Sequence, residues 1–333
     1  MITKTVDKTS VAEAAVCLKN GGLVVFPTET VYGLGADAFN EDAVKSIFTA
    51  KGRPGDNPLI VHIANMDNLS HLAKNIPHFA KSLIDKFWPG PLTLIFEKQD
   101  NVPLSVTAGL DTVAVRFPSN PVAQELITLS TGYVAAPSAN LSGSPSPTVY
   151  RHVLDDMNGR VDYIINGDGC EIGLESTVVD VSGSYPVVLR PGGITLSMLK
   201  DVVPETIMDS NIFQFVNKPK CPGMKYTHYS PKADVIVVSG DKESRRKYIQ
   251  NEILNKDSVG VLSFDGNTYQ NADCVISAGD DMHSYAKTLF YNLRLFDEHN
   301  IKTVYAEFKE QDGIGVAVKN RLFKSAGFNI VNV

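Results

Sequence analysis

The sequence lacks paired cysteines, long apolar runs and an excess of positive charge, and each absence excludes a class of protein. Its four cysteines are far apart and form no Cys-x-x-Cys pair, so we expect neither a structural zinc site nor a disulfide framework. No run approaches the roughly 18 apolar residues of a membrane span, and the N-terminus has no apolar signal core. With 31 Lys and Arg against 37 Asp and Glu, a broad basic face for nucleic acid is not expected. The sequence therefore predicts a soluble, reduced, intracellular protein that works in the cytoplasm without a membrane partner.

The length and the order of apolar runs predict two domains built from strands and helices. At 333 residues, of which 43% are hydrophobic, the chain is too long for one ordinary domain. Strands are expected over 22–26, 59–63, 92–96, 112–116, 133–136, 161–165, 177–181 and 186–190, and helices over 8–20, 40–50, 67–74, 77–87 and 119–130. This pattern favours an open, twisted α/β sheet with parallel and antiparallel neighbours.

The composition changes after residue 206, which divides the chain into three segments. Residues 1–206 form the first domain, 207–233 a linker, and 234–333 a smaller domain. The linker is rich in proline and in aromatic and basic residues, a composition unusual for a passive spacer. Strands over 235–238, 259–264, 274–277 and 303–308 alternate with helices over 241–255, 283–297 and 313–326, which predicts a Rossmann-like α/β/α layer. Its first turn lacks the G-x-G-x-x-G motif of dinucleotide binding.

The stretch from Phe26 to Ile63 is the most informative part of the chain. An apolar strand stops at Pro27 and is followed, up to Gly35, by what we interpret as a Thr- and Gly-rich loop. Lys51 and Arg53 then precede a second apolar strand. Rigid loops that carry hydroxyls, backbone N–H groups and cations at strand ends suit an anionic ligand.

Two arginines end predicted strands, where ligands bind in α/β sheets. Arg116 ends the 112–116 strand and Arg190 the 186–190 strand. A lone arginine taken at random is usually a solvated surface charge, but the strand-end positions and the bidentate geometry of guanidinium favour a functional role here. His62 lies within an apolar strand, where a core histidine with one satisfied nitrogen is the commoner outcome.

Hydroxyl-rich loops follow two other strands. Ser138 and Asn140 open the loop from Ala135 to Thr148, and Ser176 precedes the 177–181 strand. Helix capping would explain a single serine, whereas a loop this dense in donors suits phosphate or ribose hydroxyls. No nucleophile triad and no carboxylate-rich metal site stands out, so the pattern indicates chemistry driven by positioning and charge neutralisation, as in attack on a nucleotide phosphate.

The motifs at these positions resemble a known family. Phe-Pro-Thr-Glu-Thr-Val-Tyr-Gly-Leu, Lys-Gly-Arg-Pro, Asn-Pro-Leu-Ile-Val-His and Pro-Ser-Ala-Asn-Leu-Ser-Gly are similar to those of YrdC-type threonylcarbamoyl-AMP synthases, over about residues 10 to 200. The linker motif Pro-Gly-Met-Lys-Tyr-Thr-His-Tyr-Ser-Pro and the C-terminal segment resemble the long, two-domain form of that family. The resemblance therefore implies a YrdC-like catalytic domain over 1–206, a lid-bearing linker and a Rossmann-like domain.

The resemblance also implies a reaction and a set of residues. L-threonine, bicarbonate or CO2, and ATP, with Mg²⁺ and no tightly bound organic cofactor, would give L-threonylcarbamoyl adenylate and pyrophosphate. The tetrad Lys51, Arg53, Ser138 and Asn140 would be catalytic; Thr30, His62, Arg116, Ala136 and Ser176 would hold threonine; and Lys51, Arg53, Asn57, Thr112, Ser138, Asn140, Ser146, Arg190 and Tyr229 would surround ATP. Tyr229 on the linker would close over the nucleotide. The product would go to the tRNA threonylcarbamoyl-transferase machinery, with tRNA itself as a further candidate partner.

Two alternatives stay open at this point. A carbamoyl-handling hydrogenase-maturation domain shares the core, but its acylphosphatase and zinc-finger modules have no counterpart here. A non-catalytic RNA-binding module would show RNA affinity that falls steeply with salt and no pyrophosphate release. We also expect the Lys51→Ala and Arg53→Ala variants to lose turnover with little loss of stability, on the interpretation that both cations are exposed in a pocket.

Overall fold

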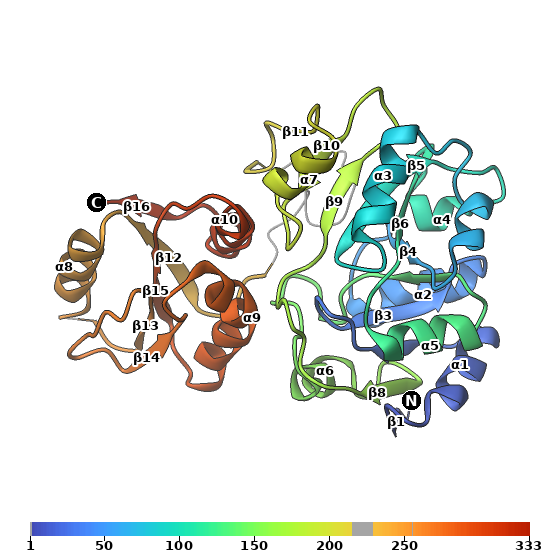
Figure 1. The fold of residues 1–333 in the computed structure, drawn as a ribbon. Helices are drawn as coiled ribbons and strands as arrows, with labels where there is room; N and C mark the ends of the chain where they lie inside the picture. Colours follow the sequence, from blue (N-terminus) through green and yellow to red (C-terminus); the bar gives the residue numbers. More distant parts are fainter. Residues whose placement is uncertain (1, 215–228, 255) are drawn as a thin grey trace. The chain divides into compact units, whose positions relative to one another are not determined.

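The computed structural model describes residues 2–214, 229–254 and 256–333 (Figure 1). The chain divides into two compact units, which we call the N-terminal unit (Met1–Ser142 with Ser146–Lys225) and the C-terminal unit (Gly143–Pro145 with Tyr226–Val333). Each is described by itself. Among the described residues, no helix is both long and apolar enough to cross a membrane.

The N-terminal unit is built on an 11-stranded sheet with the order β1-β8-β2-β3-β7-β4-β6-β5-β9-β10-β11. Its elements are β1 (Lys4–Asp7), α1 (Val11–Lys19), β2 (Val24–Phe26), β3 (Gly33–Asp37), α2 (Glu41–Lys51), β4 (Ile60–His62), the 3₁₀ helix η1 (Met66–His71), α3 (His78–Phe87), β5 (Leu92–Glu97), α4 (Leu104–Thr107), β6 (Thr112–Arg116), α5 (Pro121–Leu129), β7 (Val134–Ala136), α6 (Tyr150–Met157), β8 (Tyr163–Asn166), β9 (Thr177–Asp180), β10 (Val187–Arg190), α7 (Leu196–Val202) and β11 (Ile207–Met208). The strand pair β4–β6 is parallel and β5–β6 antiparallel, which confirms the predicted mixed sheet.

The interpretation of residues 27–35 as a loop is wrong over its last part. Gly33–Asp37 is strand β3, which pairs antiparallel with β2 to form a hairpin. Glycine is needed here by packing, because a Cβ on Gly35 would lie 2.7 Å from Val134 Cγ1 and 2.9 Å from the Phe26 ring. The local sequence favours a loop because it is rich in glycine. In the folded protein these glycines lie in a strand, where they leave space for the neighbouring Phe26 ring.

Several short elements carry no sequence signal and were not predicted. The strands β1, β11 and β16 (Ile330–Asn332) have mostly exposed or half-buried side chains, so no apolar run marks them. The strand β16 follows the predicted 303–308 strand in the chain. It pairs parallel with β12 (Asp234–Ser239).

One face of the sheet in the N-terminal unit is covered by helices over only part of its width. Helices α1 and α5 lie side by side (Figure 1) and pack on β2, β7 and β8 through an apolar cluster. A separate small cluster on β4, β5, β6, β9 and β10 contains Ile60, Ile95, Ala114, Val178 and Leu189, all strand residues. Strand register places His62 beside Arg116 and Ile60 beside Ala114. Because alternate residues share a face, His62 and Arg116 border this apolar cluster.

The C-terminal unit contains a parallel five-stranded sheet with the order β14-β13-β15-β12-β16. Its further elements are α8 (Lys242–Ile253), β13 (Val259–Ser263), β14 (Cys274–Ser277), α9 (Met282–Glu298), β15 (Thr303–Phe308) and α10 (Ile314–Ser325). Figure 1 shows α8 on one side of this sheet and α9 and α10 on the other, as expected of a Rossmann-like layer. Its interior holds a fully buried ion pair, in which Arg245 Nε lies 3.3 Å from Glu307 Oε1.

Candidate active site

Lys51 holds the loop that begins at Ser138. It is the last residue of α2, where Gly52 ends the helix in the left-handed conformation (φ 62°). Its ammonium donates to the carbonyl oxygens of Ser138 at 2.5 Å and Asn140 at 2.6 Å. The side chain is only 3% exposed, so the expectation of an exposed pocket cation is wrong for Lys51. It is a buried cross-link as well as a charge.

Ser138 and Asn140 are joined to each other and to strand β3. The Ser138 hydroxyl donates to Asn140 Oδ1 at 2.5 Å. An isolated β-bridge pairs Ser138 with Gly33, and the Leu34 N–H donates to the Pro137 carbonyl at 2.9 Å. The structure therefore brings three of the four predicted tetrad residues, Lys51, Ser138 and Asn140, into direct contact.

Arg53 and Asn57 lie on the segment between α2 and β4. Arg53 is 8% exposed, which also corrects the expectation of an exposed cation, and its guanidinium lies 6.0 Å from the centre of the Phe48 ring. Asn57 is fully buried, and neither of its side-chain polar atoms has a hydrogen-bond partner among the described residues. Since an unsatisfied buried amide is costly, Asn57 is well suited to receive a ligand group.

Arg116 is the charged centre of a second cluster at the end of β6. Its guanidinium donates to Thr30 Oγ1 at 2.9 Å and forms an ion pair with Glu29 Oε1 at 2.7 Å. The side chains of Arg116 and Glu29 are each 5% exposed. Thr30 is fully buried and its hydroxyl shares a hydrogen bond with Thr28 at 2.8 Å. A carboxylate ligand could therefore meet Arg116 in a site largely shielded from water.

His62 faces the same guanidinium from β4. Its Nδ1 lies 3.1 Å from the Ile60 carbonyl, which can only accept. Burial, and then the positive charge of Arg116, lower the pKa of His62 from 6.5 to about 3. His62 is thus neutral near pH 7, and the cluster contains one positive and one negative side chain.

Ser176 and Arg190 form a third group on the neighbouring strands. The Arg190 guanidinium donates to the Ser176 carbonyl and to its hydroxyl, each at 3.1 Å. The Ser176 hydroxyl also shares a hydrogen bond with Thr93 on β5 at 2.8 Å. Both predicted residues are buried, and register places Thr93 opposite Arg116. The third group therefore adjoins the Arg116 cluster.

The remaining predicted residues fall in different places. Ser146 is fully buried and donates to Glu175 Oε1 at 2.6 Å. Ala136 ends β7 and is 2% exposed, so it can offer mainly its backbone. Thr112 begins β6, the strand that Arg116 ends, and alternation puts the two on one face. Thr112 and Arg116 therefore mark the two ends of the apolar cluster.

Tyr229, predicted to close over the nucleotide, belongs to the C-terminal unit. Its ring is 5% exposed, stacks on Phe290 with ring centres 5.0 Å apart, and lies 5.8 Å from the Arg321 guanidinium. Its backbone has φ 69°. The rest of the predicted lid, 215–228, lies outside the described residues. The role of Tyr229 in ATP binding stays a prediction.

Comparison with known proteins matches two family models to the chain. A sequence model of the Sua5/YciO/YrdC family, described as "Telomere recombination", matches residues 16–192. The chain belongs to this family. A second model, described as "Threonylcarbamoyl-AMP synthase, C-terminal domain", matches residues 194–327. Together they correspond to the two-domain form that the sequence motifs predicted.

Members of the Sua5/YciO/YrdC family resemble the chain over nearly its full length. The threonylcarbamoyl-AMP synthase of Pyrococcus abyssi is 46% identical over 338 residues, which cover 100% of this chain and 98% of the relative. That of Bacillus subtilis is 46% identical over 325 residues, covering 96% and 94%. The crystal structure of P. abyssi Sua5 complexed with L-threonine matches with a TM-score of 0.95 and 46% identity over 100% of both chains.

Sequence reasoning missed three polar residues that contact the predicted ones. Glu29 pairs with Arg116, Thr93 with Ser176, and Glu175 with Ser146. Glu29 and Glu175 each stand next to a predicted residue, in Thr-Glu-Thr and Glu-Ser-Thr. The signal that could have found them is an acidic side chain inside an otherwise uncharged stretch. Thr93 has no signal, because a threonine in an apolar strand is common.

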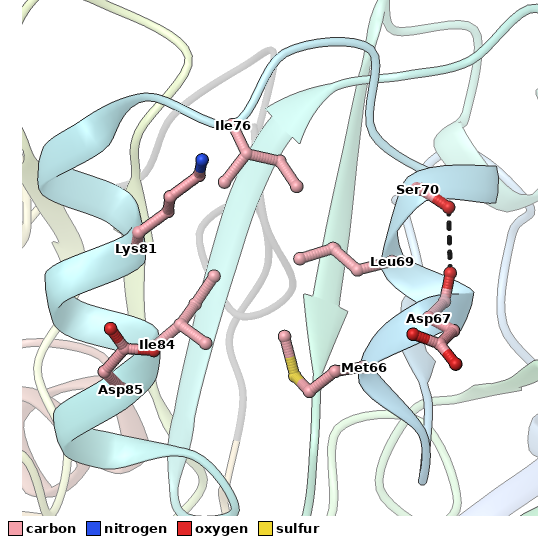
Figure 2. Close-up of a pocket in the computed structure, with 8 residues that line it drawn as sticks. All are labelled: Met66, Asp67, Leu69, Ser70, Ile76, Lys81, Ile84 and Asp85. Carbon is pink, nitrogen blue, oxygen red and sulfur yellow. Dashed lines mark hydrogen bonds between the residues drawn. The ribbon is translucent and has the colours of Figure 1, made fainter.

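Two cavities of the N-terminal unit differ in their relation to these clusters. One of about 370 Å³ lies between η1 and α3 and is lined by Met66, Leu69, Ile84 and others (Figure 2), none of them a predicted site residue. Another of about 380 Å³ is lined by Thr28 and Glu29 together with residues of the α5 N-terminus. The second cavity therefore reaches the Arg116 cluster.

Proposed function

We propose that this chain is a threonylcarbamoyl-AMP synthase, which converts L-threonine, bicarbonate or CO2, and ATP into L-threonylcarbamoyl adenylate and pyrophosphate. The observation that carries the proposal is the pair of buried polar clusters on one unit, Arg116 with Thr30 and Lys51 with Ser138 and Asn140. The full-length similarity to relatives of that name supports it.

The Arg116 cluster would bind threonine. Arg116 would take the threonine carboxylate, because guanidinium forms strong charge-assisted hydrogen bonds with carboxylates. Thr30, neutral His62, Ser176 and the backbone of Ala136 would surround the rest of the molecule. The threonine ammonium loses one proton to give the amine, which forms a new N–C bond with CO2. One C=O π bond of CO2 breaks to give a C–O⁻ group, and a second proton leaves nitrogen for solvent.

The Lys51 cluster would bind ATP next to that carbamate. A carbamate oxygen attacks the α-phosphorus, a new O–P bond forms, and the bond from the α-phosphorus to the bridging oxygen breaks to release pyrophosphate. Two anions must approach each other, so Lys51, Arg53 and Arg190 would lower the barrier by neutralising charge in a dry site. Asn57, Thr112, Ser138, Asn140 and Ser146 would complete the ATP site, with Tyr229 closing over it.

Magnesium would enter with the nucleotide as part of the substrate. Among the described residues, no group of three or more His, Cys, Asp or Glu side chains could hold a metal ion. Bound to ATP, Mg²⁺ would neutralise phosphate charge. We further propose that the product passes in the cytoplasm to the enzymes that modify tRNA.

Pyrophosphate release measured with ATP, threonine and bicarbonate, and with each omitted in turn, tests the function. We expect release only with all three, and radiolabel from bicarbonate in a nucleotide product. In Lys51→Met the rate should fall about 10²- to 10³-fold, the loss typical of one electrostatic group. Release that does not need threonine or bicarbonate would reject the proposal. RNA affinity that falls steeply with salt, without turnover, would favour the RNA-binding module instead.

A further inference from the structure

Glu29 is a buried carboxylate that the proposed reaction leaves without a role. It is 5% exposed and lies 2.7 Å from Arg116, but this contact lacks hydrogen-bond geometry. Neither carboxylate oxygen of Glu29 accepts a hydrogen bond from any described residue. A buried carboxylate with unfilled acceptors is rare and costly, because it has given up water without replacing its hydrogen bonds.

A cavity lies beside this residue. Glu29 lines the cavity of about 380 Å³ that it shares with Thr28 and the N-terminus of α5. Its backbone is fixed, because its carbonyl accepts from the Ile172 N–H at 3.0 Å. The backbone of Glu29 is therefore held at the edge of this cavity, while both carboxylate oxygens are buried.

A ligand that brings both signs leaves the charges of Arg116 and Glu29 balanced. Arg116 supplies one positive charge and Glu29 one negative charge, while the low pKa of His62, about 3, leaves that ring neutral near pH 7. A carboxylate bound to Arg116 would bring a second anion next to Glu29 in a site with little water. Threonine near neutral pH is a zwitterion, whose ammonium and carboxylate are attached to the same carbon atom. Its binding would keep the cluster neutral.

We propose that Glu29 receives the α-ammonium group of threonine while Arg116 receives its carboxylate, so that the two side chains together recognise an α-amino acid. This inference rests on the proposed function and adds a residue to the threonine site. Glu29 and Arg116 lie 2.7 Å apart, about as close as the two charged groups of the substrate. The pair would discriminate against hydroxy acids and simple carboxylic acids, which lack the second charge.

Calorimetric titration with two ligands tests the assignment. The ligands are L-threonine and (R)-3-hydroxybutyrate, which has the same hydroxyl and carboxylate but no amine. The wild-type chain should bind threonine more tightly. In Glu29→Gln, which keeps the size but loses the charge, threonine affinity should fall about 10- to 100-fold, the worth of a hydrogen bond to a charged group. Affinity for 3-hydroxybutyrate should stay within about threefold or rise, so that the preference for the amine is lost.

Two further variants distinguish a direct contact between Glu29 and threonine from an indirect effect of Glu29 on Arg116. Glu171→Gln changes an exposed carboxylate on the same cavity and should leave both affinities unchanged. Glu29→Asp keeps the charge and should retain most of the preference, which tests the inference even if the Gln variant fails to fold. Affinity for ATP reports whether the unit is intact.

Equal loss for both ligands in Glu29→Gln would mean that Glu29 only orients Arg116, and would overturn the inference. An unchanged preference for threonine would overturn it as well. If the wild-type chain fails to bind threonine, the proposed function fails and this inference falls with it. If the wild-type chain binds threonine but shows no preference over 3-hydroxybutyrate, only the inference fails.

Discussion

Replacing Lys51 should weaken the N-terminal unit itself, contrary to what its place in a cationic motif suggests. In Lys51→Met the side chain keeps its length, but the carbonyl oxygens of Ser138 and Asn140 lose their donor. A buried, unsatisfied acceptor costs about 1–3 kcal/mol, and the partly buried Ser138 contact lies at the lower end. Part of this loss is offset, because methionine removes the cost of burying an ammonium group. We therefore expect the free energy of unfolding to fall by about 2–4 kcal/mol.

Urea unfolding followed by tryptophan fluorescence measures this change. Trp88 is the single tryptophan of the chain, is 9% exposed and lies in the N-terminal unit. Its signal therefore reports the unfolding of that unit alone. The difference in free energy follows from the shift in urea midpoint when the two transitions have equal slopes.

Lys45→Met is the matched control on the same helix. The Lys45 side chain is 64% exposed and only makes a surface ion pair with Asp42 at 3.1 Å. Its replacement should change the free energy of unfolding by less than about 0.5 kcal/mol. If Lys51→Met is as stable as this control, the ammonium does not support the loop and the reasoning is refuted.

Three further variants test other parts of the structure. The pKa of His62 is about 3 in the folded protein and 6.5 in the unfolded chain, so acid favours the unfolded wild-type chain. The His62→Gln variant lacks this group. Its loss of stability relative to wild type should therefore shrink by about 1.4 kcal/mol for each pH unit between pH 6 and pH 4. Gly35→Ala should lower the urea midpoint by the equivalent of about 1–3 kcal/mol, because its Cβ would lie 2.7 Å from a neighbouring side chain. Gly183→Ala is the control and should leave the midpoint unchanged, because no atom lies within 4 Å of the added Cβ. Arg245→Met should destabilise the C-terminal unit by about 3–5 kcal/mol in amide hydrogen exchange, and Arg246→Met on the same helix, 45% exposed, by less than about 0.5 kcal/mol.

Each of these has an outcome that contradicts it. A pH-independent difference between wild type and His62→Gln would mean that the histidine is not buried in its neutral form. Equal stability of Gly35→Ala and Gly183→Ala would remove the packing reason for strand β3. Equal exchange rates in the two arginine variants would show that the ion pair with Glu307 contributes nothing.

Most of the fold could be predicted because its longer strands and helices have strong local signals. The runs at 92–96 and 112–116 are mostly apolar, and the predicted strands match β5 and β6 almost residue for residue. The hairpin strand β3 could not be predicted in this way. Its two glycines are explained by the Phe26 ring across the strand pair, which no window of local sequence contains.

The candidate site could likewise be predicted only in part. Motifs pointed to Lys51, Ser138 and Arg116 because ligands bind in α/β sheets near strand ends, where these cations and hydroxyls lie. Burial of the two cations Lys51 and Arg53 was not predicted, since motif chemistry is the same for an exposed and a buried side chain. The acceptors that surround Lys51 are backbone carbonyls, and every residue type has one.

The sequence by itself determined the types of the longer elements, the two-part organisation of the polypeptide and the residue types available for chemistry, because these depend on periodicity and composition. Only the tertiary structure decided which charges face each other. Arg116 meets Thr30 across 86 positions of the chain, and Lys51 meets Ser138 across 87. Such pairs follow from strand order and register, which are set by the burial of many distant side chains at once.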